Sequence, residues 1–276
     1  MSTLFDAPDW RCMIRQDRDN GLNKGAAVAG SGDIVAGWDR RSAEMRARHS
    51  GHLDLRYGPR ERNRIDFFKV AEKAPTLLFI HGGYWQTRAK EAFSLFAGGP
   101  MMFGINSAMI GYTLAPEATY GEIVAEIHTA IDFLVEQLPA RGGDANRIAV
   151  SGWSAGGHLA ALALSHPKVK GAIGISGIYD LEPIKLGLDE VMSHRNSPMM
   201  QPAGAMKPLS LVVGSAELPL LRKQTADFAC HRARHGLPVS YEEIPGADHF
   251  SVMDELASPT GRITALVRQM FERKAG

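Results

Sequence analysis

The segment Gly152-Trp153-Ser154-Ala155-Gly156 is the feature of the sequence that most clearly suggests chemistry. The residues before it are typical of a strand, and the Ala- and Leu-rich residues after it are typical of a helix. So tight a turn between strand and helix needs small flanking residues, and it lifts the serine hydroxyl above the sheet. The helix N-terminus adds positive partial charge where an oxyanion would form. The pattern predicts that Ser154 is a nucleophile; the alternative is a glycine-rich turn with a solvated serine.

A second glycine-rich segment, His81-Gly82-Gly83-Tyr84-Trp85, directly follows a continuous apolar run. Glycine lets backbone N–H groups approach a reacting carbonyl closely. We therefore expect the N–H groups of Gly83, Tyr84 and Ala155 to form an oxyanion hole. A tight loop without function is the alternative. His81 is interpreted as structural, because it belongs to the loop that must shape the hole.

One histidine and one glutamate complete the expected set. Among ten histidines, His249 alone lies in a late loop after the last predicted strand. It also follows Ser154 in the order Ser, acid, His that accompanies a serine nucleophile at a strand-to-helix turn of this kind. Glu217 follows the preceding predicted strand and would hold the imidazole tautomer. Asp180 is the alternative acid, and Glu217 would then be a capping or surface residue. Asp248 is adjacent to the base and is expected to point elsewhere.

Strands and helices alternate along the chain, which predicts βαβ units and a mostly parallel central sheet with helices on both faces, an α/β fold. Residues 65–70 alternate in polarity and suit an edge strand. The other predicted strands are 75–80, 107–112, 147–151, 169–175, 209–213 and 239–244, and the predicted helices are 117–138, 155–165, 220–235 and 263–274.

Two further segments flank or interrupt this pattern. Residues 1–60 are predicted to form an N-terminal arm with one helix near 35–49, either disordered or lying over the core. Residues 61–276 are predicted to form the catalytic domain, and residues 183–207 read as an insertion. The arm and the insertion together are expected to form a small cap.

Composition excludes several classes of protein. Of 276 residues, 45% are hydrophobic and 22% are charged, which is typical of a globular domain and not of a disordered chain. Lys and Arg number 31 against 30 Asp and Glu, a balance that argues against a nucleic-acid partner. Two cysteines cannot build a disulfide framework, and we expect both to be free thiols. No signal-like N-terminus or long apolar run is present, so no membrane partner and a cytoplasmic location are expected.

The assembled motifs resemble those of the α/β-hydrolase superfamily, in the branch of hormone-sensitive-lipase-like esterases and kynurenine formamidases. The resemblance covers about residues 50–276. The segments that carry it are Asp54-Leu55-Arg56-Tyr57-Gly58, Arg62 to Asp66, His81 to Trp85, Ser176 to Ile184, Arg195-Asn196-Ser197-Pro198, Val213 to Thr225 and Asp248-His249-Phe250. Tyr84 stands where lipase-like esterases have a third glycine. Glu217 stands where the family usually has Asp, and Trp153 stands where His is more usual.

The resemblance implies a metal-independent serine hydrolase that needs no cofactor and cleaves an aryl formamide such as N-formyl-L-kynurenine. Two alternatives stay open: a carboxylesterase or amidase for small xenobiotic esters, amides or carbamates, and a hydrolase fold reused to bind a ligand. Trp85 and Trp153 are candidates for the wall of a substrate pocket, with core packing as the alternative for Trp85. The expected partner is a small, aromatic substrate molecule. Dimers are frequent in the resembled family, so a homodimer is possible.

Overall fold

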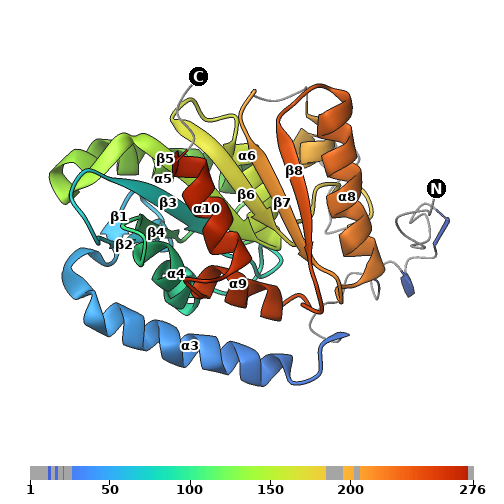
Figure 1. Cartoon of the computed structure of the whole chain (residues 1–276), viewed down its shortest axis with the longest axis horizontal. Coiled ribbons are helices and arrows are strands. Elements are labelled where there is room, and N and C mark those ends of the chain that lie inside the picture. The colour runs from blue at the N-terminus through green and yellow to red at the C-terminus, as the bar shows by residue number, and fades with distance from the viewer. Residues whose placement is uncertain are drawn as a thin grey trace.

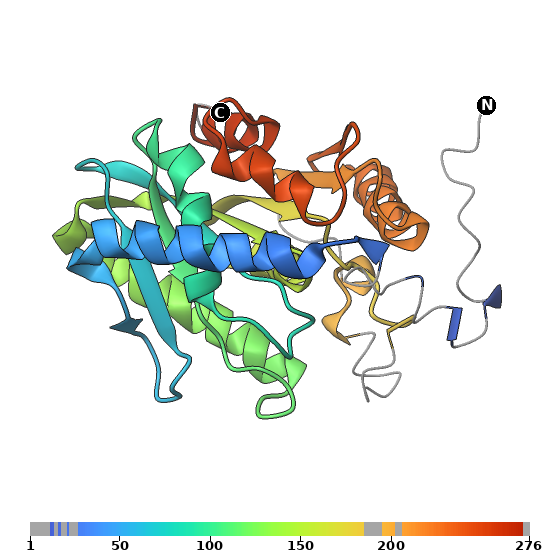
Figure 2. The ribbon, with the colours of Figure 1, turned by 90° about the horizontal axis from the view of Figure 1, so that it is seen from below.

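The computed structural model describes residues 12–13, 16–17, 21, 27–184, 195–201 and 206–272. The predicted arm, 1–60, and the predicted insertion, 183–207, therefore lie partly outside the described residues. The described residues form a central sheet with helices on either side (Figures 1 and 2).

Within the described residues the sheet has eight strands in the order β1-β2-β4-β3-β5-β6-β7-β8. Strands β3 to β8 are parallel, whereas β2 pairs antiparallel with both β1 and β4. The prediction of a mostly parallel sheet is confirmed. The strands are β1 Leu55–Arg56, β2 Arg64–Phe68, β3 Ala74–Ile80, β4 Asn106–Ile110, β5 Gly143–Trp153, β6 Val169–Ile175, β7 Leu209–Gly214 and β8 Val239–Ile244.

All the predicted helices are present, with differences at their ends, whereas the short helices α4 and α9 were not predicted. They are α3 Ser31–Arg48, α4 Gly98–Met101, α5 Tyr120–Arg141, α6 Ala155–Ala163, α8 Pro219–Arg234, α9 Asp254–Ala257 and α10 Arg262–Glu272, with 3₁₀ turns at Ser50–His52, Lys90–Ala97, Pro198–Met200 and Ser251–Met253. Helix α5 begins at a capping box, in which Thr119 and Glu122 each satisfy the other's backbone N–H. That cap explains why the helix starts three residues after the predicted position.

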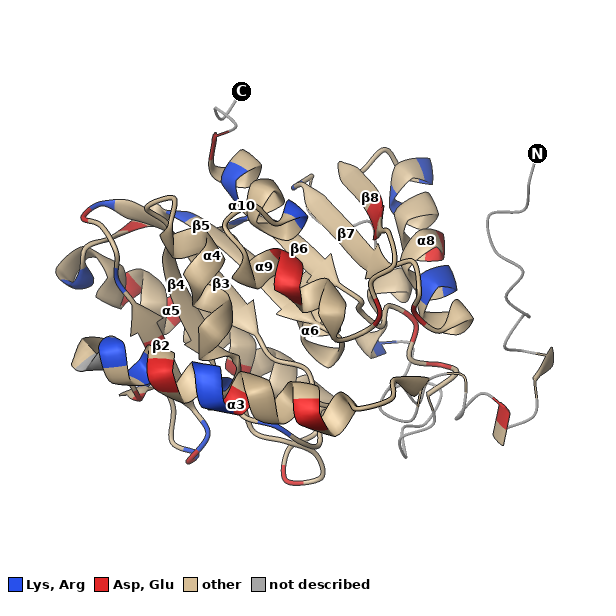
Figure 3. Ribbon diagram, turned by 60° about the horizontal axis from the view of Figure 1, so that its bottom comes forward, with Lys and Arg blue, Asp and Glu red and all other residues tan. Residues whose placement is uncertain are grey.

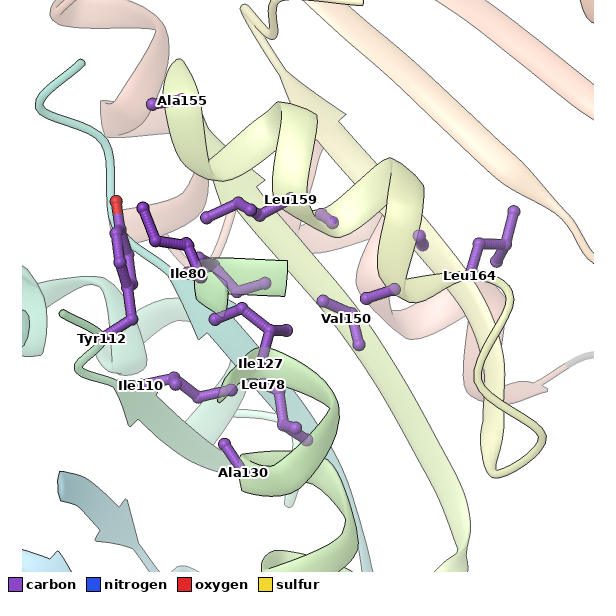
Figure 4. Packing of buried hydrophobic residues seen from close by; sticks show 14 of the residues in the cluster. Leu78, Ile80, Ile110, Tyr112, Ile127, Ala130, Val150, Ala155, Leu159 and Leu164 are labelled. Atoms are coloured by element: carbon purple, nitrogen blue, oxygen red, sulfur yellow. The ribbon is translucent and has the colours of Figure 1, made fainter. Parts of the chain in front are cut away.

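Each strand sends alternate side chains to two separate hydrophobic clusters, one on each face of the sheet. In β3, Leu78 and Ile80 pack toward α5 and α6, while Leu77 and Phe79 pack toward α3, α9 and α10. Figure 4 shows the first of these faces, where Leu78 and Ile80 lie close to Ile127 of α5. Because β3 and β5 are buried on both faces, their carboxyl ends form a rigid base for the loops that follow.

Strand β2 differs from the prediction of an edge strand with one exposed face. It lies second from the edge, and its Asp66 is completely buried. Lys90 donates to Asp66 at 2.8 Å and to Asp54 at 2.7 Å, and Arg46 of α3 pairs with both carboxylates. Burial of a carboxylate is tolerated here because two cations neutralise it.

Charged residues of both signs are spread along α3 (Figure 3). The buried residues of this helix include Val35 and Trp38, which join the second hydrophobic cluster. Helix α3, which belongs to the predicted N-terminal arm, therefore packs against the sheet domain through an apolar stripe and through Arg46.

Three further observations concern the described part of the chain. None of its helices combines the length and hydropathy needed to cross a bilayer. Across residues 27–184, 195–201 and 206–272, His, Cys, Asp and Glu side chains form no group of three or more that could hold a metal ion. Cys12 and Cys230 are free thiols, and both are exposed.

Candidate active site

Ser154 lies at the sharp turn between β5 and α6. Its backbone has φ 58° and ψ −121°, a strained conformation for a residue with a side chain. Its N–H donates to the carbonyl of Ile175 at 2.8 Å, which ties the turn to the neighbouring strand β6. A Cβ on Gly152 would collide with the carbonyl of Gly156, and a Cβ on Gly156 would collide with that of Ile80. Both glycines of the motif are therefore required by the close approach of β5, α6 and β3.

His249 and Glu217 are brought together from loops that follow β8 and β7. The Nδ1 atom of His249 lies 2.8 Å from Oε2 of Glu217, and both side chains are almost fully buried. The other carboxylate oxygen, Oε1, accepts hydrogen bonds from the hydroxyl of Ser176 and from the N–H of Gly214, the latter at 3.0 Å. With Oε1 occupied in this way, Oε2 is directed at the imidazole and can hold it in the tautomer that carries a proton on Nδ1.

The alternative acids have other hydrogen-bond partners. Oδ1 of Asp180 accepts from the N–H of Glu182 at 3.0 Å, and the Asp180 backbone N–H donates to Gln224 at 3.0 Å. Asp248 accepts from the N–H groups of Phe250 and Ser251, each at 2.8 Å, and so closes the turn that carries His249. Burial alone would raise the pKa of Asp248, but these hydrogen bonds outweigh it and lower the pKa.

Two other buried histidines are kept neutral by their surroundings. Burial lowers the pKa of His81 to about 4, and its ring stacks on Tyr112 at 4.3 Å. Burial likewise lowers the pKa of His158 to about 4, and its Nε2 lies 2.7 Å from the carbonyl of Asn196. His81 thus packs beneath the glycine-rich loop, in agreement with its structural interpretation.

The loop after β3 has an unusual backbone. Gly83, Tyr84 and Trp85 have φ values of 115°, 58° and 57°, so three consecutive residues adopt left-handed conformations. A Cβ at Gly83 would collide with the carbonyl of Thr87, and this explains the second glycine of the motif. Ala155 is the first residue of α6 and is fully buried, and an N–H at this position has no acceptor within its own helix. Strained loops of this kind cluster at functional sites.

Gly82 lies directly against the serine turn. A Cβ at this position would be 2.6 Å from Cε3 of Trp153, 2.8 Å from its carbonyl oxygen and 3.0 Å from Cβ of Ser154. The sequence identified Gly82 only as part of a motif, whereas the structure shows that the loop and the serine turn touch here.

We expect Gly82→Ala to lower kcat/KM by about 100-fold, since a methyl group in this contact must push the loop away from Ser154 and a 1 Å displacement can cost that much. Steady-state kinetics together with a melting curve would measure the effect. Gly121→Ala is the matched control, because a Cβ on Gly121 of α5 would meet nothing within 4 Å. Equal activity in the two variants would contradict the importance of this contact.

The two tryptophans expected at a substrate pocket lie in different surroundings. The exposed fraction of Trp85 is 0%, and its ring packs against Tyr120 and His158 in the core. Its ring is therefore closed off from solvent, which favours its interpretation as core packing. Trp153 is 5% exposed, and its indole N–H donates to the carbonyl of His249 at 2.8 Å.

Sequence reasoning missed the residues that support the site from a distance. Ser176 and Gly214 bond to Glu217, and Trp38 of α3 packs edge-on against Trp153 with 5.4 Å between ring centroids. Ser176 carries a positive φ of 49°, an outlier invisible in the sequence. Two signals were available: its place directly after β6, at the same edge of the sheet as Ser154, and its membership of a segment that carries the family resemblance.

The family model BD-FAE matches residues 68–190 of the chain. The kynurenine formamidase of Danio rerio is 29% identical over 242 residues, which cover 79% of this chain and 81% of that protein. The kynurenine formamidase of Salmo salar is 28% identical over 243 residues, with 79% and 81% covered. Esterase LipC of Mycobacterium tuberculosis is 28% identical over 239 residues, covering 72% of this chain and 59% of that protein.

Two solved structures with similar folds are a proposed thioesterase and an esterase. A proposed thioesterase from Silicibacter sp. TM1040 superposes with a TM-score of 0.81 at 26% identity, covering 90% of this chain and 98% of that chain. An esterase from Thermogutta terrifontis superposes with a TM-score of 0.65 at 18% identity, covering 81% and 96%. The chain therefore has the α/β-hydrolase fold and is a hydrolase of that type, similar to kynurenine formamidases and esterases.

Proposed function

We propose that the chain hydrolyses an aryl formamide of the N-formyl-L-kynurenine type through Ser154, His249 and Glu217. The observation that carries the proposal is the buried hydrogen bond of 2.8 Å between His249 and Glu217. Trp153, which directly precedes the strained turn at Ser154, packs with its ring centroid 4.7 Å from that of His249. The similarity to kynurenine formamidases over 79% of the chain supports the choice of substrate.

The proposed reaction has two halves. The Ser154 oxygen attacks the formyl carbon while His249 takes the serine proton, and Glu217 stabilises the resulting imidazolium. The backbone N–H groups of Gly83, Tyr84 and Ala155 would receive the oxyanion. The carbon–nitrogen bond then breaks as His249 returns the proton to the departing amine, leaving a formyl ester on Ser154. Water activated by His249 attacks that ester, and formate is released.

The leaving group explains why a serine enzyme suits this substrate. An aryl amine is a better leaving group than an alkyl amine, so an aryl formamide is easier to cleave than an ordinary amide. The formyl group also needs almost no space beside Ser154. The close packing of Gly82 and Trp153 against that residue is compatible with so small an acyl group.

A carboxylesterase acting on small esters, amides or carbamates is the second candidate. It is favoured by the similarity to esterase LipC and by the superposition on a proposed thioesterase at 26% identity. Both candidates use the same three side chains and differ only in the group that leaves.

The two candidates separate in a paired assay of N-formyl-L-kynurenine and p-nitrophenyl acetate with purified protein. We expect kcat/KM for the formamide to exceed that for the ester by at least ~10-fold, a difference of about 1.4 kcal/mol in transition-state binding. Turnover of the ester with negligible formamide cleavage would move the assignment to the carboxylesterase. Turnover of neither, with no labelling of Ser154 by a fluorophosphonate probe, would favour a fold reused for ligand binding.

A further inference from the structure

Trp153 connects the serine turn to the histidine loop. Its backbone precedes Ser154, while its indole N–H reaches 2.8 Å to the carbonyl oxygen of His249. The two rings also lie against each other, with 4.7 Å between centroids and 34° between planes. One side chain thus contacts both the main chain and the imidazole of the proposed base.

The backbone of Trp153 is held by the sheet. It is the last residue of β5 and pairs in register with Ile175 of β6, whose carbonyl also accepts the N–H of Ser154. Both neighbouring strands are hydrogen-bonded to β5 along its length. Because the indole is attached to such a strand, the group that accepts its hydrogen bond is also held in a fixed position.

Aromatic neighbours fix the orientation of the indole. Trp38 of α3 packs against it nearly perpendicular, at 80° with 5.4 Å between centroids, and Phe250 lies 5.7 Å away. Phe93 contacts it from a third direction at 5.8 Å. Because these rings are buried and close-packed, the indole cannot rotate without displacing them.

We propose that Trp153 is a positioning residue for His249, and that Trp38 supports it from the N-terminal helix. His249 is then held at two points: its Nδ1 by Glu217 and its carbonyl by Trp153. With both points fixed, the imidazole has little freedom to turn about its own bonds. The inference rests on the proposed function, since it assigns the support of the base that this function requires.

Trp153→Phe tests the inference, because phenylalanine keeps an aromatic ring and removes the donor. We expect kcat to fall by about 10- to 100-fold, as small displacements of a catalytic group cost that much, while KM changes by less than ~3-fold. The low-field proton resonance of the His249–Glu217 hydrogen bond should shift or broaden in the same variant. Phe68→Leu is the structural control: Phe68 is fully buried in the same hydrophobic cluster and has no ring contact with Trp153 or His249. It should lower the melting temperature and leave kcat nearly unchanged.

Trp38→Leu provides a second route if Trp153→Phe does not fold. It leaves the indole donor in place and removes its neighbour, so we expect a smaller decrease in kcat, of several fold, with the low-field resonance broadened. Wild-type kcat in Trp153→Phe, or a decrease matched by Phe68→Leu at equal loss of melting temperature, would overturn the inference. Ser154→Ala distinguishes this from failure of the proposed function: activity that survives Ser154→Ala refutes the mechanism itself.

Discussion

Ser154→Ala should lower kcat by about 10⁴- to 10⁶-fold on any acyl substrate of the protein, the range seen when a serine nucleophile is removed. The hydroxyl is the atom that would form the acyl ester, and no second hydroxyl stands at the turn. Alanine fits the same space, so the fold should persist with an unchanged melting temperature. Rates with the formamide and the ester, measured beside a melting curve, would check both expectations.

Ser151 provides the matched control for this experiment. It lies three residues earlier on β5, is fully buried, and its hydroxyl has no hydrogen-bond partner among the described residues. Ser151→Ala should therefore keep wild-type kcat and KM. If Ser154→Ala and Ser151→Ala retained equal activity, the nucleophile would have to be sought elsewhere.

Glu217→Gln should lower kcat by about 10³- to 10⁴-fold, comparable to the loss when a triad acid becomes an amide. Glutamine has nearly the same shape, but it carries no charge to stabilise an imidazolium. The amide nitrogen of the glutamine would face another hydrogen-bond donor at either oxygen position. Ser176 and Gly214 donate to one oxygen of this carboxylate, and His249 lies against the other. The KM should change little, since the carboxylate is buried behind the imidazole.

Asp180→Asn discriminates between the two acids considered from the sequence. Asp180 follows β6 and closes its own turn with Glu182, so its amide variant should retain most of the activity. A result with the two effects exchanged, a large loss in Asp180→Asn and a small one in Glu217→Gln, would transfer the role of the acid to Asp180.

The parallel sheet could be predicted because strands buried on both faces leave a strong local signature. Residues 75–80 form a continuous apolar run, and residues 169–175 are interrupted by a charge only at Lys170; both form strands within a residue of the predicted bounds. Strand β2 was misplaced as an edge strand because Asp66 looked like a solvent-facing residue. Its partners, Arg46 and Lys90, are 20 and 24 positions away, and no local pattern reveals that they meet.

The candidate site shows the same division between local and distant information. Local steric requirements leave a recognisable sequence motif. Such motifs made it possible to predict the roles of Ser154, its flanking glycines and the loop at Gly83. The pairing of Glu217 with His249 could be proposed from their positions after successive strands. The hydroxyl of Ser176 and the ring of Trp38 could not, because each acts across the fold on a residue far away in the sequence.

Helix α3 combines two attachments of different character. Arg46 meets the buried carboxylate of Asp66 near one end, and Trp38 packs edge-on against Trp153 eight positions earlier, about 12 Å along the helix axis. A shift of the helix by one turn, about 5.4 Å, would leave a buried charge without its counterion, at a cost of several kcal/mol. The buried ion pair at Asp66 therefore fixes the register of α3 against the sheet, and this register determines that Trp38 is the residue that packs beside the histidine loop.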